Sequence, residues 1–271
     1  MRRKSCLSLL PPWWSIAPRL AAVLVLAVPV LAGGREARAA ELVVFAAGAT
    51  ESTMRDTVGT FEKESGWTVK LSYGAVGALR DKLYAGQPAD LTIVTPAVIE
   101  QLAAKGYVRR DASVALGQVG GGIAVRRGAP RPAVATPEEF KRALLAAKEV
   151  YYADPATATA GAYFMKVADS LGVGDAVRAK GHSAPGGKEA MRLMAKSRAG
   201  AIGVTQISEI LSVPEVVLIG PYPGSLQRIT TYTAIPLIRA KHPEAAQAFL
   251  RFLTSPSVLA RFKRAGFEPP R

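Results

Sequence analysis

Two hydrophobic periodicities alternate along the chain from about residue 42 onward. Short apolar runs such as 42–46 are typical of buried strands, whereas Met54, Val58 and Phe61 recur at the spacing of one helix face. Strands are predicted at residues 42–46, 67–72, 90–95, 120–126, 150–153, 201–205 and 228–238. Helices are predicted at residues 50–63, 78–84, 97–105, 136–148, 162–171, 188–196, 243–253 and 257–265.

The regular alternation of strands and helices predicts an α/β fold with parallel sheets covered by helices on both faces. The pattern restarts after the proline-rich turn at 130–132, and a long β-rich run followed by two helices closes the chain. We therefore predict two lobes, each a mainly parallel sheet flanked by helices. Lobe 1 comprises residues 40–121 and 228–271, and lobe 2 comprises residues 122–227.

The strand-to-helix junctions of lobe 1 carry small and hydroxyl residues. They are Gly48-Ala49-Thr50, the turn 74–77 and Thr95-Pro96. In open α/β sheets, ligands bind beyond the carboxyl ends of the strands. The ligand site is therefore predicted at these junctions, in a cleft between the lobes.

Residues 1–39 have the pattern of a secretory signal peptide. A basic start at 2–4 precedes an apolar stretch at 20–32, and Ala37 and Ala39 are small residues at a cleavage site. The apolar stretch is shorter than the roughly 20 residues that span a bilayer and contains Pro29. We predict cleavage after Ala39, with a retained N-terminal anchor as the alternative.

Composition narrows the possible functions of the exported part. The chain carries a formal net charge of +14; residues 1–39 hold six basic and one acidic residue, so residues 40–271 carry +9. The basic residues are scattered rather than interleaved with aromatics, so nucleic acid is not predicted as a partner, but a positive field suits an anion. The single cysteine, Cys6, lies in the predicted signal peptide, and His182 and His242 lack metal spacing. Neither a metal nor a cofactor is predicted, and we expect a monomer.

Several segments in order resemble the periplasmic molybdate-binding proteins of ABC transporters. They are 44–47, 61–66, 73–79, 85–90, 152–155, 160–163, 201–203 and 249–256. The resemblance covers essentially all of residues 40–271. It implies the class II periplasmic-binding fold, closing around a small anion in the cleft and delivering it to a permease in the inner membrane.

The family binds its oxyanion through two serine hydroxyls at helix starts, backbone amides of lobe 2 and a tyrosine. In this chain the two serine positions are occupied by Ala49 and Val76, and the tyrosine position falls near Val204. Each lost charge-assisted hydrogen bond costs roughly 1.5–3 kcal/mol. Molybdate binding in the family's manner is therefore not expected, and the pocket should suit a larger ligand, with Thr50 or Ser52 supplying a displaced hydroxyl.

A second branch of the same superfamily also resembles this chain. Residues 185–187, 203–210 and 220–227 are similar to solute-binding proteins that include an aconitate isomerase-like branch. This resemblance implies a tricarboxylate ligand, which agrees with the positive field.

Ten residues are predicted to bind the ligand, each with a simpler structural alternative. Thr50 and Thr95 could instead cap helices, Thr157 and Thr159 could be exposed turn residues, and Lys188 at a helix start needs a compensating anion. Gly77 and Ala160 would act through their amides. The predicted set is Ala49, Thr50, Val76, Gly77, Thr95, Thr157, Thr159, Ala160, Lys188 and Gln206.

Two functions of different classes remain open. A solute-binding protein needs only lobe closure on a small anion, either an oxyanion or an organic carboxylate. An aconitate isomerase-like enzyme needs a base, for which Lys188, Tyr163 and Glu209 are all possible, so no catalytic residue is assigned. Tyr163 is otherwise expected to pack its helix, Ser208 to face the cleft and Glu209 to be solvated. A sensor domain that signals to a receptor is a third alternative.

Overall fold

The computed structural model describes residues 41–198 and 200–270, so the predicted signal peptide lies outside it. The strands are β1 (Glu41–Ala47), β2 (Thr68–Gly74), β3 (Leu91–Val94), β4 (Val114–Arg126), β5 (Glu149–Ala153), β6 (Gly181–Ala184), β7 (Ala201–Gln206), β8 (Val216–Pro221) and β9 (Ile229–Pro236). The α-helices are α1 (Glu51–Ser65), α2 (Val76–Tyr84), α3 (Pro96–Ala104), α4 (Pro137–Ala146), α5 (Thr159–Ser170), α6 (Gly174–Ala179), α7 (Gly187–Ala195), α8 (Ile207–Leu211), α9 (Pro243–Leu253) and α10 (Pro256–Arg264). Short 3-10 helices follow β1 (Gly48–Thr50), precede β4 (Arg110–Ala112) and precede β9 (Gly224–Leu226).

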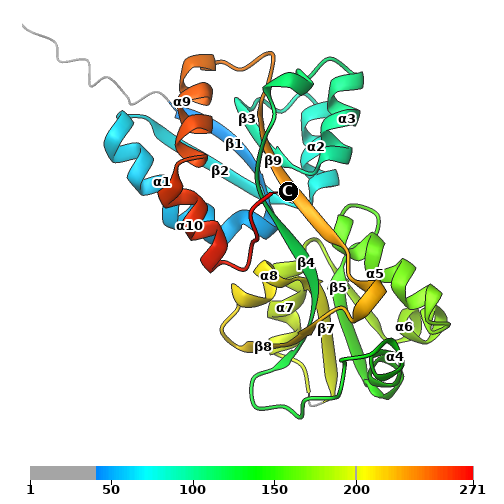
Figure 1. Cartoon of the computed structure of the whole chain (residues 1–271). Helices are drawn as coiled ribbons and strands as arrows, with labels where there is room; N and C mark the ends of the chain where they lie inside the picture. The colour runs from blue at the N-terminus through cyan, green and yellow to red at the C-terminus, as the bar shows by residue number, and fades with distance from the viewer. Residues whose placement is uncertain (1–40, 199, 271) are drawn as a thin grey trace, which may run out of the picture. The chain divides into compact units, whose positions relative to one another are not determined.

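The strands form two α/β lobes that share β4 (Figure 1). In lobe 1, β1 pairs in parallel with β2 and β3, and β9 joins β3 to β4 by antiparallel pairing. In lobe 2, β5 pairs in parallel with β6 and β7, and β7 and β8 pair antiparallel with β4. The predicted two-lobed periplasmic-binding fold is confirmed, with parallel strands at the outer side of each sheet and antiparallel strands where the chain passes between lobes.

Each lobe has its own hydrophobic core, in keeping with the helical faces predicted from the sequence. Phe249 of α9 is fully buried in lobe 1, where its ring centroid lies 4.8 Å from that of Phe61 in α1. Phe140 of α4 and Phe164 of α5 are fully buried in lobe 2. The sequence positions at which one lobe ends and the next begins, 121 and 228, stay predictions.

Several elements differ from the predicted ones for local reasons. Strand β4 begins at Val114, six residues early, because the glycines at 120–122 continue the strand instead of introducing it. Strand β6 (Gly-His-Ser-Ala) and the five-residue helix α8 were not predicted, since neither is long or apolar enough to show a periodicity. Strand β8 and helix α6 were also not predicted.

Helix starts follow the predicted capping chemistry in one lobe and not in the other. Thr136 forms a full capping box with Glu139 at the start of α4, as expected from Thr-Pro-Glu-Glu. At the start of α1, by contrast, Thr50 makes no side-chain cap, because its hydroxyl donates to the carbonyl of Ala47 at 2.8 Å. The amides at the start of α1 are therefore not satisfied by this side chain.

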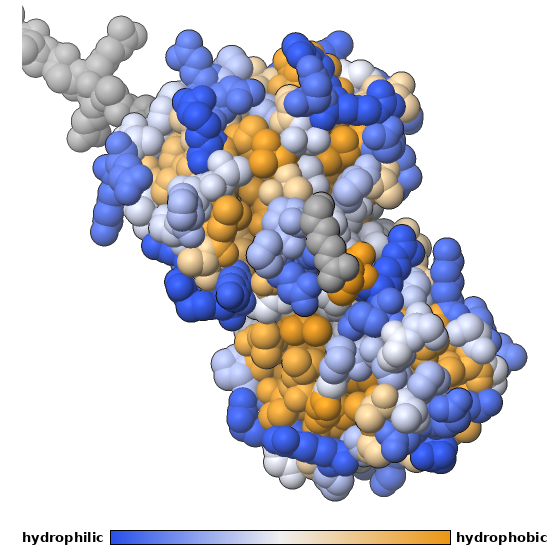
Figure 2. Space-filling view, viewed as in Figure 1, coloured by the Kyte–Doolittle hydropathy of each residue, from blue (hydrophilic) through white to orange (hydrophobic). Residues whose placement is uncertain are grey.

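Hydrophilic side chains are spread over the visible face of both lobes, with apolar side chains between them (Figure 2). Large apolar residues such as Leu211 and Ile238 are about half exposed, at 51% and 54%. Within residues 41–198 and 200–270, none of the helices combines the length and apolar character needed to cross a bilayer.

Candidate functional site

A small cavity lies where strand-to-helix junctions of both lobes meet. We call it the first chamber; its volume is about 30 Å³. Lobe 1 contributes the ends of β1 and β2, and lobe 2 contributes the starts of α5 and α7 together with Glu209. The lining residues are Ala47, Gly48, Ala49, Gly74, Ala75, Val76, Ala153, Ala158, Thr159, Ala160, Gly186, Gly187, Glu209 and Tyr232. The cleft thus lies beyond the carboxyl ends of the strands, as predicted.

A second chamber adjoins the first at Thr159 and Ala160, and its volume is about 10 Å³. Its lining is more polar and aromatic, and consists of Gly121, Thr159, Ala160, Tyr163, Thr205, Gln206, Tyr222, Arg228 and Thr230. A water molecule occupies roughly 30 Å³ in the liquid. On this measure the two chambers have room for only a few water molecules, so a ligand larger than that requires the cleft to open.

Half of the predicted ligand-binding residues line these chambers. Ala49 and Val76 come from lobe 1 and line the first chamber, Thr159 and Ala160 line both chambers, and Gln206 lines the second. The other five predicted residues, Thr50, Gly77, Thr95, Thr157 and Lys188, do not line either chamber. Thr50 is fully buried with its hydroxyl bonded to Ala47, and Thr95 is 4% exposed at the start of α3.

The amide of Gly77 is predicted to hold the ligand, but it is bonded to the protein. It donates to the carbonyl oxygen of Thr157 at 3.0 Å, which links the start of α2 to the turn before α5. A β-carbon at Gly77 would lie only 2.7 Å from that oxygen, so this position requires glycine. The Thr157 hydroxyl donates instead to Asp154 at 3.2 Å.

Lys188 has its compensating anion, but the anion is part of the protein. Its ammonium lies 3.0 Å from Oε1 of Glu51, and the two side chains are 14% and 11% exposed. The pair joins the first turn of α7 to the first turn of α1. A cation at a helix start interacts unfavourably with the helix dipole. The sequence predicts that the ligand compensates for this, whereas in the structure Glu51 does.

Glu51 also accepts a hydrogen bond from Arg55, with Nε to Oε1 at 2.8 Å. Burial alone would raise the pKa of Glu51, but the hydrogen bonds and charges of Arg55 and Lys188 outweigh it and hold that pKa below its ordinary value. Glu51 is therefore ionised, and it pairs with Arg55 of its own helix and with Lys188 across the cleft.

Glu209 is buried rather than solvated, which corrects the expectation from the sequence. It is 6% exposed, it accepts a hydrogen bond from the Thr205 hydroxyl, and the nearby backbone amides of Gln206, Gly187 and Lys188 favour its charged form. The carboxylate thus sits on the amino end of α7, a position that favours anions. It was missed because one acidic residue beside a short helix carries no local signal of burial.

The surroundings of Glu209 oppose its ionisation. Complete burial raises the pKa of its carboxyl group, while the Thr205 hydroxyl and the three amides partly counteract this rise. One carboxylate oxygen faces lobe 1, since a β-carbon at Gly48 would lie 3.3 Å from Oε1. Glu209 is therefore a titratable group in the wall of the first chamber.

Two further expectations about side chains are wrong. Ser208 was expected to face the cleft and Ser52 to supply a displaced hydroxyl, but both line a separate cavity of about 220 Å³ beside α10. Tyr163 does pack against the lobe 2 core, as expected, but it also lines the second chamber, and its hydroxyl donates to the carbonyl of Leu226 at 3.0 Å. Val204, near the family's tyrosine position, belongs to the core of lobe 2, while Tyr232 and Tyr222 line the chambers.

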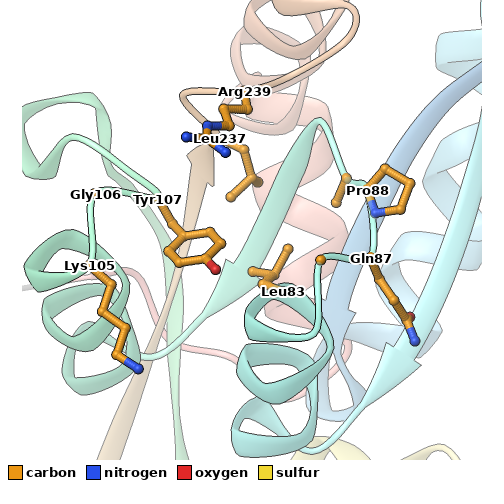
Figure 3. A pocket seen from close by; sticks show the side chains of 10 residues that line it. Leu83, Gln87, Pro88, Lys105, Gly106, Tyr107, Leu237 and Arg239 are labelled. Carbon is orange, nitrogen blue, oxygen red and sulfur yellow. The ribbon is translucent and has the colours of Figure 1, made fainter.

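A larger cavity of about 350 Å³ lies elsewhere in lobe 1 (Figure 3). It is formed after α2, after α3 and after β9, and Tyr107 lies between Leu83 and Leu237. Part of its lining, residues 86–89, directly precedes β3, so the cavity lies at the amino end of that strand. Ligands of α/β sheets bind at the carboxyl ends of the strands instead. The ammonium of Lys105 there lies 4.0 Å from the centre of the Tyr84 ring. We therefore assign the ligand site to the two chambers.

Metal binding has no support in the part of the chain that the structure describes. There, histidine, cysteine and acidic side chains form no group of three or more that could hold an ion.

The two lobes, with a cleft between strand ends, define a solute-binding protein. A family model described as bacterial extracellular solute-binding protein matches residues 42–268, and this chain belongs to that family. A curated relative, aconitate isomerase from a Pseudomonas species, is 29% identical over 258 residues, which cover 92% of this chain and 95% of the relative.

Solved structures show the same fold at low sequence identity. The periplasmic molybdate-binding protein of Azotobacter vinelandii has a TM-score of 0.71 at 19% identity, covering 85% of this chain and all of that one. A sulfate-binding protein of Mycobacterium tuberculosis has a TM-score of 0.70 at 18% identity, covering 85% and 87% of the two chains.

The packing of Glu209 on α7 makes a testable prediction about two adjacent glycines. In Gly187→Ala, the new β-carbon would lie 2.0 Å from Oε2 of Glu209 and 1.8 Å from the Thr205 hydroxyl oxygen, so the carboxylate must move. We expect the free energy of unfolding to fall by about 1–3 kcal/mol or more, measured by urea denaturation.

The matched control is Gly186→Ala, because nothing lies within 4 Å of a β-carbon there. It should cost only about 0.5–1 kcal/mol, as expected when alanine replaces glycine at the N-cap of a helix. Equal stability of the two variants would contradict the position assigned to Glu209.

Proposed function

We propose that the chain captures a small organic polycarboxylate in the interlobe cleft. The observation that carries this proposal is the convergence of helix starts on the first chamber. The residues before α1, α2, α5 and α7 all line it, and none of these four helix starts has a side-chain cap. Helix dipoles that converge on one point favour an anion there.

A carboxylate suits this cleft better than a tetrahedral oxyanion. The hydroxyl donors of the molybdate-binding family are replaced by Ala49 and Val76, and both residues line the first chamber. The similarity to an aconitate isomerase supports a tricarboxylate in particular.

Ligand entry requires the lobes to separate. The contacts that hold the cleft are the Gly77–Thr157 hydrogen bond and the Lys188–Glu51 ion pair. Both contacts join elements of opposite lobes, so both break when the cleft opens. Contacts between the ligand and the lobes must compensate for any of the two that does not form again when the cleft closes. Such a hinge motion is the usual mechanism of two-lobed binding proteins.

The biological setting follows from family membership and from the predicted signal peptide. A bacterial extracellular solute-binding protein with a cleavable leader would work in the periplasm. There it would act as a monomer and deliver its ligand to an ABC permease of the inner membrane, as the resemblance to molybdate carriers implies.

The proposal is tested by thermal unfolding of residues 40–271 with trans-aconitate, citrate, molybdate or sulfate in excess. A ligand present at about 100 times its dissociation constant adds about 2.7 kcal/mol to the stability of the folded state. We expect an increase in melting temperature with a tricarboxylate and none with the oxyanions. An increase with molybdate alone would contradict the proposal.

A second function, isomerisation of cis- and trans-aconitate, is favoured by Glu209. Of the three possible bases, Lys188 is ion-paired with Glu51, Tyr163 donates to a carbonyl, and Glu209 has a buried carboxylate in the chamber wall. In an allylic proton shift, a base takes a proton from the carbon beside a carboxylate. The electron pair moves into the carboxylate as a dienolate, and the proton returns at the other end. We infer that Glu209 would be this base.

The enzyme proposal predicts the behaviour of Glu209→Gln. Turnover of trans-aconitate to the cis isomer, followed by chromatography, should fall at least about 100-fold, because glutamine cannot accept the proton. Wild-type turnover should fall as the pH is lowered through the raised pKa of Glu209, since only the ionised form is a base.

The control for that experiment is binding of trans-aconitate, which Glu209→Gln should retain because glutamine keeps the shape of the side chain. Undiminished turnover in this variant would exclude Glu209 as the base. If the wild-type protein bound trans-aconitate without turning it over, the enzyme proposal would be excluded and only the carrier function would remain.

A further inference from the structure

The second chamber contains a cation that sequence reasoning did not single out. Arg228 lies at the second crossover between the lobes, and its guanidinium carbon is 5.3 Å from the centre of the Tyr163 ring. We propose that Arg228 binds one carboxylate of the ligand and makes the second chamber the subsite that selects polycarboxylates over tetrahedral oxyanions. This inference rests on the proposed function and extends it to a particular residue and ligand class.

The backbone that carries Arg228 is held firmly. The side chain of Gln227 pairs with Gly121 in both directions, accepting from its amide at 2.9 Å and donating to its carbonyl at 2.9 Å. A β-carbon at the neighbouring Gly120 would lie 2.8 Å from Gln227, so glycine permits this close pairing. Arg228 thus follows directly after a residue that is hydrogen-bonded to β4, just before β9 begins.

The rest of the chamber is suited to a polar group. Helix α5 begins at its wall with Thr159 and Ala160 and has no side-chain cap. Gln206 also lines the chamber; it is 3% exposed, and its Oε1 has no hydrogen-bond partner among the described residues. Its Nε2 donates to the Thr230 hydroxyl at 3.1 Å. A buried amide oxygen without a partner indicates that the chamber accommodates another polar group.

The geometry of the arginine selects the ligand class. A guanidinium offers two parallel N–H donors that match the two oxygens of a planar carboxylate. Stacking on Tyr163 leaves the edge of the guanidinium available for such a pair. Because the first chamber adjoins at Thr159 and Ala160, a ligand whose carboxylates are a few bonds apart could reach both chambers, whereas a compact oxyanion could not.

The test is calorimetric titration of wild type, Arg228→Gln and Arg228→Lys with trans-aconitate, tricarballylate and molybdate. Arg228→Gln should weaken tricarboxylate binding by about tenfold or more, because a charge-assisted pair is lost. Arg228→Lys should restore part of the affinity, since the charge is kept and the fork is lost.

The matched control is Arg239→Gln, which removes an exposed arginine that lines the separate cavity of Figure 3. It should bind tricarboxylates within about twofold of wild type, which corresponds to less than 0.5 kcal/mol. Melting temperatures of the variants without ligand serve as the folding control. Because Arg228 is exposed, its substitution should leave the melting temperature close to that of the wild type.

The outcomes separate this inference from the proposed function. Tricarboxylate binding that Arg228→Gln retains within twofold would overturn the Arg228 subsite and leave the proposed function standing. Wild-type binding of molybdate without any carboxylate would overturn both. If the wild type bound none of trans-aconitate, tricarballylate and molybdate, both the Arg228 subsite and the proposed function would also be overturned.

Discussion

The buried carboxylate of Glu209 on the amino end of α7 is the interaction on which the cleft depends. It lies against the start of α7, whose amides favour its charged form, and it occupies the space that a side chain at Gly187 would fill. A buried carboxylate is costly unless it is hydrogen-bonded, so Thr205, α7 and the start of α8 must keep their places around it. This requirement connects the positions of β7, α7 and α8, which together form the lobe 2 wall of the first chamber.

The groups predicted to hold an anion are instead bonded to acceptors of the protein itself. The Gly77 amide bonds to the Thr157 carbonyl, Lys188 pairs with Glu51, and the start of α7 faces the carboxylate of Glu209. Each of these donors therefore has an acceptor within the protein, and ligand binding at the helix starts stays a prediction. A ligand must compete with some of these acceptors. Its affinity is therefore the difference between the bonds it makes to the protein and the internal bonds it replaces.

The fold could be predicted largely from the sequence, and the candidate site only in part. Apolar periodicity revealed the long elements of both lobes, because burial of one face imposes it directly. The Lys188–Glu51 pair joins residues 137 positions apart, and no local pattern indicates such a contact. Arg228 was missed because an arginine at a strand start is ordinary, and its importance depends on Tyr163 and Gln206 from other segments. Ala160, which is predicted to act through its backbone amide, came from the family resemblance, and it lines both chambers.

The central claim is that the two chambers form one polycarboxylate site, and a crystal structure of residues 40–271 with trans-aconitate tests it most directly. The account predicts electron density for the ligand between the lobes, with one carboxylate paired with the Arg228 guanidinium and another at the helix starts of the first chamber. Ligand density in the cavity beside Tyr107 and Arg239, or between the lobes but away from Arg228, would contradict it.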